Sequence, residues 1–531
     1  MVSTVTMIVL AILSITVIVL RRNRLRPLPP GPPGWPIIGN LFDLQQEFPW
    51  ITYSNWSKTY GNIMFMRALT TPMLIVSSPD IAFDLMDKRS AIYSSKPTSV
   101  VDEMTGWDFA LSLMPYGQRW RNIRRNVHEH FHQMVTPNYR DKQTKHIHAF
   151  LRQCLGNTAK QFNSTLVRQL LATTVLDVVY GIRIKDMDDD YIKTIVEALE
   201  VFGESKISGK YWVDFMPVLK YVPRWVPGAA FAKFAARSRP VVEEMLNRPF
   251  NAVRDGETHN DCVALSMLAK IESQPDIEKK KEEEMYAKYA TGILYSGAVE
   301  TTFSLLQTFF CGMAMRPDIQ QRARQELDSV VGPERLPTYD DQDHLPYVQA
   351  IFMECLRWMT TVPLGVPHSA TQDDYYDGYF IPSGTIIVPN AWHMLHNPEE
   401  YPEPDKFNPD RFIKDGKINP AIRDPATIAF GFGRRSVRSD VHETGYSQIL
   451  FILYMLASIC PGRHFAKDTA FLVIASILHT FDVKPSIDEN GHELDPTPQL
   501  HGSMVSFPSP LNYRLKSRSE AAEKLVHATE L

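Results

Sequence analysis

Cysteine is scarce in this chain, with five residues among 531, and no two of them form a CxxC pair. They stand at Cys154, Cys262, Cys311, Cys355 and Cys460. An odd number of scattered cysteines excludes a zinc ribbon and a disulfide framework, because both need closely spaced sets. An excess of one charge is lacking too: 56 basic side chains face 60 acidic ones, for a formal net charge of −4. This balance argues against a nucleic-acid binder. We expect most of the cysteines to be reduced, buried thiols in a protein that faces the cytosol.

Charged side chains are absent from Met1 to Leu20, and four arginines occupy the next six positions. At a rise of about 1.5 Å per residue, about 20 helical residues cross the roughly 30 Å apolar core of a bilayer. Positive flanking residues stay on the cytoplasmic side. A cleaved signal peptide is the alternative, but its positive charges would precede the apolar run. We predict a single transmembrane helix over residues 1–20, with the body of the protein in the cytosol.

The chain has no internal repeat and no linker long enough to separate two large domains. Residues 21–36 are basic and proline-rich, and proline excludes helix and sheet because it fixes φ and removes the amide donor. We predict a stiff hinge there, one domain over residues 37–518, and a polar tail over residues 519–531. The charge run from Asp276 to Glu284 is typical of a solvated helix face.

Helical periodicity dominates between Asp80 and Trp358 and is clearest from Glu283 to Met315. That segment exceeds 30 residues, so it would span about 50 Å and cross a whole domain. Short β-type runs lie nearer the two ends of the chain, at Ile63–Met66, Met73–Val76, Thr385–Val388 and Met504–Phe507. We predict a mainly α fold with small β-sheets.

One cysteine, Cys460, precedes a Pro-Gly turn and a helical pattern. The positive end of a helix dipole and free amide donors stabilise a thiolate, the form that binds a metal. A lone cysteine near a helix start is more often only packed, so the position alone does not decide between the two. Upstream, Phe430 to Arg435 form a glycine-rich bend followed by two cations, which suits close approach to a flat ligand that carries carboxylates. It is no dinucleotide fingerprint, because GxGxxG is incomplete.

These two segments resemble the halves of the haem-binding signature of the cytochrome P-450 family, FGxGRRxCxGRxxA. The resemblance implies haem b (iron protoporphyrin IX) as the cofactor, with Cys460 as the ligand of the iron. It places the haem-contacting positions at Phe430, Gly433, Arg435, Cys460 and Gly462.

Three more motifs match the family in the same order along the chain. Glu354 and Arg357 match its ExxR motif, and residues three apart share one face of a helix. The loop that contains Arg411 is similar to its PERF-type loop, whose arginine joins the same ion network. Trp120 and Arg124 match its WxxxR helix, which implies that Arg124 faces a haem propionate.

The long predicted helix carries Gly297 to Thr302, which resembles the family's [AG]Gx[DE]T motif with Ala298 in place of the second glycine. A small residue one turn before Thr301 leaves room over a flat cofactor, and a threonine hydroxyl can replace a lost backbone hydrogen bond. The resemblance implies a dioxygen slot to which Glu300 and Thr301 relay protons. On the residues alone, an ordinary buried helix with a polar stripe is the alternative.

Two sets of histidines need separate interpretation. His368 follows the ExxR helix where the family has a strand running past the haem, so it would donate to a propionate, and residues 363–366 would line the pocket; a surface histidine is the alternative. His128, His130 and His132 alternate along a helix and do not share one face, so we interpret them as incidental rather than as metal ligands.

The main departure from the family is the distance between Arg435 and Cys460. Here 24 residues separate them where the family has one, so about 23 residues, 436–458, are surplus. We predict a retained intron in the gene model, with a genuine loop as the alternative. Loop closure costs only about 0.6 kcal/mol per doubling of length. An apolar stretch beside the ligand is the greater problem, because it could displace the bend that supports the thiolate.

The resemblance implies a haem-thiolate monooxygenase that inserts one oxygen atom of O2 into a small apolar substrate. Because the chain has no flavin or nicotinamide fingerprint, electrons would come from a separate NADPH-dependent flavoprotein reductase. The arginine-rich neck, with Arg121 and Arg125, would help to dock such an acidic partner.

The overall pattern is typical of fungal secondary metabolism at the endoplasmic reticulum membrane. The segment from Lys210 to Lys233 resembles the family's mobile roof, which dips into the bilayer. Two alternatives stay open: a haem-deficient relic, produced by the insert, or a haem-thiolate isomerase or dehydratase. The Glu300–Thr301 pair counts against the isomerase and the dehydratase.

Overall fold

The computed structural model describes residues 26–156, 161–184, 188–207, 209–258, 260–433 and 460–530. The predicted transmembrane helix over 1–20, Arg435 and the predicted insert over 436–458 lie outside these ranges. Within the described ranges, no helix is both long enough and apolar enough to cross a membrane.

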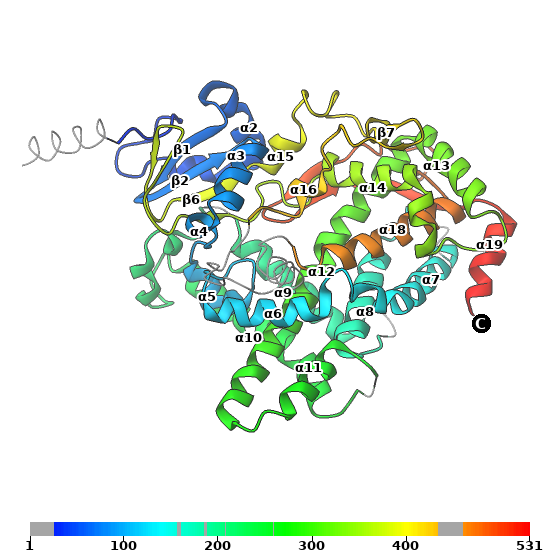
Figure 1. Cartoon of the computed structure of the whole chain (residues 1–531), viewed down its shortest axis with the longest axis horizontal. Helices are drawn as coiled ribbons and strands as arrows, with labels where there is room; N and C mark the ends of the chain where they lie inside the picture. Colours follow the sequence, from blue (N-terminus) through cyan, green and yellow to red (C-terminus); the bar gives the residue numbers. More distant parts are fainter. Residues whose placement is uncertain are drawn as a thin grey trace, which may run out of the picture.

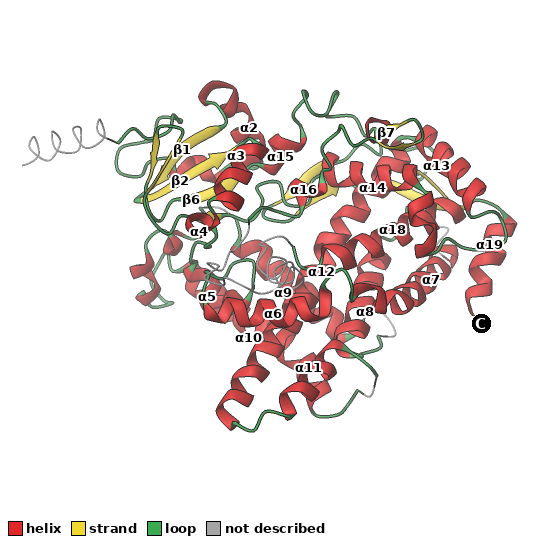
Figure 2. Cartoon of the chain, viewed as in Figure 1, coloured by secondary structure: helices red, strands yellow, loops and turns green. Residues whose placement is uncertain are grey.

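Helices form most of the structure, and Figure 2 shows the largest group of strands at the upper left of the view. Their bounds are α2 (Pro49–Tyr60), α3 (Pro79–Phe83), α4 (Ser90–Tyr93), α5 (Val100–Thr105), α6 (Gln118–Phe131), α7 (Arg140–Gly156), α8 (Thr165–Tyr180), α9 (Asp190–Ser205), α10 (Ala230–Arg254), α11 (Val263–Glu272), α12 (Ile277–Met315), α13 (Pro317–Val330), α14 (Pro346–Trp358), α15 (Ala391–Leu395), α16 (Ala426–Ala429), α18 (Arg463–Thr480) and α19 (Glu520–His527). The short π-helix is η2 (Asp84–Lys88), and three short 3-10 helices are η3 (Trp107–Phe109), η5 (Trp212–Asp214) and η6 (Pro217–Tyr221).

The strands form one sheet of four and several pairs. The four-stranded sheet has the order β1-β2-β6-β3, with bounds β1 (Ile63–Ala68), β2 (Thr71–Val76), β6 (Ile386–Pro389) and β3 (His368–Ser369). The β2–β6 pair is parallel, and its neighbours are antiparallel. The pairs are β4 (Asp374–Tyr376) with β5 (Tyr379–Ile381), β7 (Ile413–Lys414) with β8 (Lys417–Ile418), β9 (Phe481–Pro485) with β12 (Tyr513–Ser517), and β10 (Gln499–Gly502) with β11 (Ser506–Ser509). The predicted class, mainly α with small sheets, is confirmed.

One predicted strand, Met504–Phe507, is displaced by two residues. The observed strand β11 begins at Ser506, because Gly502 and Ser506 are the last paired residues of the β10–β11 hairpin. Residues 503–505 form its turn, and the Ser503 hydroxyl donates to the Gly203 carbonyl of α9 at 3.0 Å. The tip of this hairpin is therefore attached to α9.

The long helix α12 runs through the middle of the molecule (Figure 1) and has 39 residues. It begins at Ile277, six residues before the predicted Glu283, because the Asp276 side chain caps it by accepting from the amides of Glu278 and Lys279. The predicted solvated charge run forms its first turns. Its second half is buried among α8, α14 and α18.

Helices α7 and α8 are joined by a partly buried charge cluster. Asp177 on α8 accepts from His146 Nε2 at 2.9 Å and pairs with Lys142 Nζ at 3.0 Å. Burial raises the pKa of the Asp177 carboxyl, but the hydrogen bonds from these two partners outweigh it and lower the pKa to about 2.

The proline-rich segment is packed onto the sheets from residue 26 onward. The Pro27 carbonyl accepts from the Phe380 amide at 2.7 Å, and the Pro30 carbonyl accepts from the Phe65 amide at 2.9 Å. A Cβ on Gly31 would lie 1.9 Å from the Phe65 carbonyl oxygen, so only glycine allows this approach. The described part of the predicted stiff hinge contains no regular helix or strand and is packed against β1 and β5.

The predicted polar tail is a helix, α19, over most of its length. The Ser519 hydroxyl caps it by accepting from the Ala522 amide at 3.2 Å. Ala522 and Val526 are buried, and Arg152 of α7 donates to the Thr529 carbonyl at 3.1 Å. The spacing of its apolar residues, four apart, is what allows this helix to dock on α7.

Candidate active site

The two halves of the haem-binding signature meet in the fold. The Cys460 amide donates to the Phe430 carbonyl at 3.1 Å, although 29 positions separate the two residues. Gly431 and Gly433 have φ angles of +89° and +105°, which other residues rarely adopt. The Gly433 amide donates to Asp87 Oδ1 of η2 at 2.9 Å. The glycine bend is thus fixed at both ends and lies directly beside the cysteine.

Cys460 is a free thiol with exposed surface, immediately before α18. The protein around it is dense enough that desolvation raises the pKa of the thiol. The amides of Gly462 and Arg463 and the guanidinium groups of Arg124 and Arg463 oppose this and lower the pKa. Gly462 caps α18, and a Cβ there would come to 4.0 Å from the Cys460 sulfur. These donors and cations are what a metal-bound thiolate requires.

Helix α6 brings two predicted residues to this place on one face. Trp120 is buried, and its indole Nε1 donates to the Leu111 carbonyl at 3.2 Å. Arg124 is 5% exposed, and burial lowers the pKa of its guanidinium to about 10, against the opposite influence of Cys460 beside it. A buried cation therefore lies next to the thiol.

A second cation, Lys96, was missed by sequence reasoning. The segment before it pairs with β3, since the Ser369 amide donates to the Ser95 carbonyl at 2.8 Å. Lys96 is 6% exposed and donates to the Val366 carbonyl at 2.9 Å. On the paired strand, the His368 ring donates from Nδ1 to the Tyr93 carbonyl at 2.8 Å and is buried. A single lysine before a proline is typical of an exposed loop, so no sequence signal marked it.

The middle of α12 has an open face. Gly297 is exposed, a Cβ there would meet no atom within 4 Å, and Ala298 beside it is half-buried. One turn later, the Thr301 hydroxyl donates to the Gly297 carbonyl at 2.9 Å. In a helix that is otherwise buried over this half, Gly297 and Thr301 mark where a flat group and a small ligand can approach.

Glu300 has a partner on another helix. Its two carboxylate oxygens accept from Nε and Nη2 of Arg168 on α8 at 3.1 and 3.2 Å. The guanidinium carbon of Arg168 lies 4.0 Å from the centre of the Phe303 ring, which fixes the orientation of the fork. The two predicted proton-relay groups are therefore held separately, Glu300 by α8 and Thr301 by its own helix.

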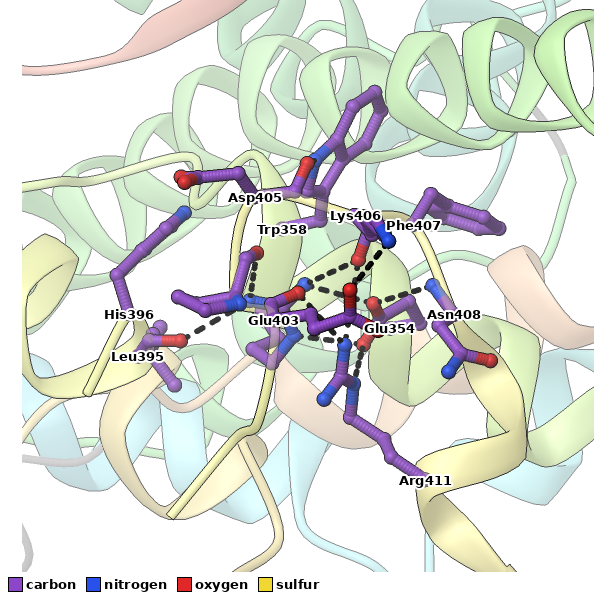
Figure 3. A network of polar contacts seen from close by, with 12 residues as sticks. Glu354, Trp358, Leu395, His396, Glu403, Asp405, Lys406, Phe407, Asn408 and Arg411 are labelled. Atoms are coloured by element: carbon purple, nitrogen blue, oxygen red, sulfur yellow. Dashed lines mark hydrogen bonds and ion pairs between the residues drawn. The ribbon is translucent and has the colours of Figure 1, made fainter. Parts of the chain in front are cut away.

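The ExxR motif forms the buried network of Figure 3. Arg357 donates from Nε and Nη2 to the two Glu354 oxygens, both at 2.7 Å, and neither side chain is exposed. Arg411 pairs with Glu354 at 3.2 Å, and the Asn408 amide donates to Glu354 Oε1 at 2.8 Å. The remaining donors of Arg357 reach the carbonyls of residues 395, 404 and 406. One carboxylate thus ties α14 to the irregular segment after α15.

The described residues contain no group of three or more histidine, cysteine or acidic side chains that could hold a metal ion. His128 and His132, four residues apart, do lie on one side of α6, with ring centres 5.2 Å apart, unlike the expectation that the three histidines share no face.

The predicted roof segment exposes several large apolar side chains. Trp212, Met216, Val218, Tyr221 and Trp225 are between 39% and 81% exposed. The segment lies at the same end of the molecule as the four-stranded sheet (Figure 1), and Phe215 packs against the apolar cluster of that sheet. The exposed apolar side chains of the predicted roof are therefore concentrated in one short segment of the chain.

Comparisons with known proteins give one consistent result. A family model described as "Cytochrome P450" matches residues 29–436, so the match ends at the first residue of the predicted insert. The chain is 38% identical to "Cytochrome P450 monooxygenase COX2" of Coprinopsis cinerea over 498 residues, which cover 93% of this chain and 90% of that protein. It is 36% identical to "Cytochrome P450 monooxygenase ple1" of Rhodocybe pseudopiperita, with the same two coverages. Because this alignment covers 93% of the 531 residues, it must extend past residue 436, so the similarity continues beyond the start of the predicted insert.

Proposed function

The chain belongs to the cytochrome P-450 family of haem-dependent monooxygenases, and from this premise we propose that Cys460 ligates the iron and that the substrate is a small apolar compound. We further propose that electrons come from a separate NADPH-dependent flavoprotein reductase. The proposed location is the endoplasmic reticulum membrane, with residues 1–20 as a single anchor. The hydrogen bond that brings Cys460 against the Phe430 bend is the observation that carries this proposal.

Cys460 and three buried side chains have the chemistry that a haem group needs. Arg124, Lys96 and His368 supply cationic or polar donors of the kind that pair with two propionate carboxylates. The absence of a side chain at Gly297 leaves space beside α12 for a flat ring. When bound, a thiolate-ligated haem supplies the activation of dioxygen that oxygen insertion needs.

The chain's own groups would position the small molecules and the protons. The Thr301 hydroxyl donates to the Gly297 carbonyl. By rotating, it can instead donate its hydrogen bond to a ligand on the open face of α12. The Glu300 carboxylate reaches that face only after leaving Arg168, so proton delivery through it includes the breaking of a bidentate ion pair. The apolar roof supports an apolar substrate that arrives from the bilayer.

Spectroscopy of the purified chain tests this proposal. We expect the reduced protein exposed to carbon monoxide to give the shifted absorption band of a haem-thiolate, and Cys460→Ala to lose it. Cys262→Ala, which changes a half-buried thiol on α11's cap, is the matched control and keeps the band. Haem that binds unchanged to Cys460→Ala would refute the ligand assignment.

Two more measurements separate the alternatives. Consumption of O2 and NADPH in the presence of a flavoprotein reductase supports a monooxygenase, whereas turnover without either supports an isomerase or dehydratase. For the location, we expect the full chain to remain in the membrane pellet after alkaline carbonate extraction, and a soluble protein would contradict the anchor.

A further inference from the structure

The glycine bend that lies beside Cys460 has a second neighbour, the short π-helix η2. The Gly433 amide at one end of the bend donates to Asp87 Oδ1 at 2.9 Å. One residue earlier, the Phe432 ring meets the Phe83 ring edge-on, with ring centres 5.2 Å apart. Phe432 is 3% exposed and belongs to the same apolar cluster as the buried residues of η2. The bend is therefore docked on the η2 segment by one polar contact and one apolar contact.

The π-helix η2 is itself held by the hairpin strand β4. Within η2, the Arg89 amide donates to the carbonyl of Asp84, five residues earlier, at 3.0 Å, which is the pattern of a π-turn. The Arg89 guanidinium donates to Asp374 Oδ2 and to the Tyr375 carbonyl, both at 2.7 Å. The Tyr376 hydroxyl donates to Asp84 Oδ2 at 3.0 Å. These contacts hold η2 at both of its ends, so its middle offers the bend an acceptor in a fixed position.

The covalent connection between the bend and Cys460 is long. It takes 30 residue steps from Phe430 to Cys460, where the spacing in the family would give seven. A longer loop costs more entropy to close, and this difference in length disfavours the closed arrangement about ninefold. The connection therefore positions the bend only weakly, and contacts from elsewhere in the fold have to hold it. The η2 segment holds the Gly433 end of the bend, and the Cys460 amide holds the Phe430 end.

We infer that Asp87 is a positioning residue for Cys460. By accepting from the Gly433 amide, it keeps the Phe430 carbonyl within reach of the amide of the cysteine. A hydrogen bond to an ionised acceptor changes an equilibrium constant by about tenfold or more. This contribution is large enough to offset the ninefold cost of the long connection. The inference rests on the proposed function and deepens it, because it takes Cys460 as the ligand of the iron.

Two substitutions of Asp87 should have graded effects on the ligand of the iron. The measurement is the absorption of the reduced full chain under carbon monoxide, which separates haem that keeps the thiolate from haem that has lost it. Asp87→Ala removes the acceptor, so the ratio of the two forms should fall about tenfold. Asp87→Asn keeps a neutral acceptor of the same size, so the ratio should fall about threefold. The matched control is Asp80→Asn on neighbouring α3, whose side chain is 81% exposed and pairs with Arg423, and it should leave the ratio unchanged.

Shortening the connection separates positioning from a general loss of stability. Removal of residues 436–458 favours the closed arrangement about ninefold. The variant that combines this deletion with Asp87→Ala should therefore recover the wild-type ratio within about twofold. A combined variant that loses the thiolate form as strongly as Asp87→Ala alone would show that Asp87 supports the fold at large, and the inference would be wrong.

Hydrogen exchange at the Cys460 amide gives a second readout, and it needs no haem. Because the bend presents the carbonyl that this amide contacts, exchange should be about tenfold faster in Asp87→Ala and about threefold faster in Asp87→Asn than in the wild-type chain. Asp80→Asn should exchange at the wild-type rate. If the wild-type chain takes up no haem, the proposed function fails while this measurement still tests the role of Asp87. Exchange at Cys460 that is unchanged in both Asp87 variants overturns the inference, whatever the haem content.

Discussion

Removing residues 436–458 should strengthen the contact between Cys460 and the Phe430 bend. In the full chain a loop of 30 residue steps is closed by the hydrogen bond between these two residues. Without the 23 surplus residues the same contact closes a loop of seven steps. The closure entropy scales as three halves of RT times the logarithm of loop length, so shortening it favours the closed arrangement by about 1.3 kcal/mol, or about ninefold.

The assay compares haem-thiolate content per mole of protein and the free energy of unfolding in urea. A matched variant replaces residues 436–458 with a glycine-serine segment of equal length, which removes the apolar sequence but keeps the loop length. We expect the deletion to bind more haem than both full-length chains. If the deletion binds no more haem than the unchanged chain, residues 436–458 are a genuine part of the protein and the retained-intron interpretation is wrong.

Three further outcomes follow from the buried charges. Glu354→Gln should lower the free energy of unfolding in urea by about 3–5 kcal/mol, because it leaves a buried arginine without its carboxylate; Glu403→Gln, on an exposed pair, should leave the unfolding midpoint unchanged. Arg124→Met should raise the pKa of the Cys460 thiol, so its alkylation by iodoacetamide slows severalfold at neutral pH, whereas the exposed Arg125→Met should not change it. Asp177→Asn should abolish a contribution of about 2–3 kcal/mol to the free energy of unfolding, because the folded pKa of Asp177, about 2, lies below the ordinary value near 3.9. The wild-type chain holds this contribution above pH 4 and loses it as the pH falls toward 2, and equal acid-denaturation curves for the two chains would contradict this.

Long periodic segments were predictable, and short paired ones were not. The class, the long helix and three of the four proposed strand runs agree with the structure within a few residues. The strands β3, β7 and β8 have two residues each, which is too short for a period of two to be visible. Their existence depends on partners far away in the sequence.

In the candidate site too, contacts within one motif could be predicted from the sequence, and contacts between separate elements could not. Spacing within one motif predicted that Glu354 and Arg357 share a helix face, and they do. The partners supplied by other elements could not be read from spacing: Arg168 reaches Glu300 only because α8 packs on α12, and Lys96 reaches Val366 only because its segment pairs with β3. The start of α12 could have been found, since Asp276 before a helical run is an ordinary capping signal.

The attachment of the proline-rich segment sets the shortest form of the chain that can be expected to fold intact. Pro27 and Pro30 each satisfy a backbone amide of a sheet, so a truncation that begins at residue 34 would strip the acceptors from Phe380 and Phe65 and uncover the edge of β1. A truncated form of the enzyme should therefore start no later than Arg26. Residues 27–30 are thus held in place by backbone hydrogen bonds to two separate sheets, β4–β5 and the four-stranded sheet.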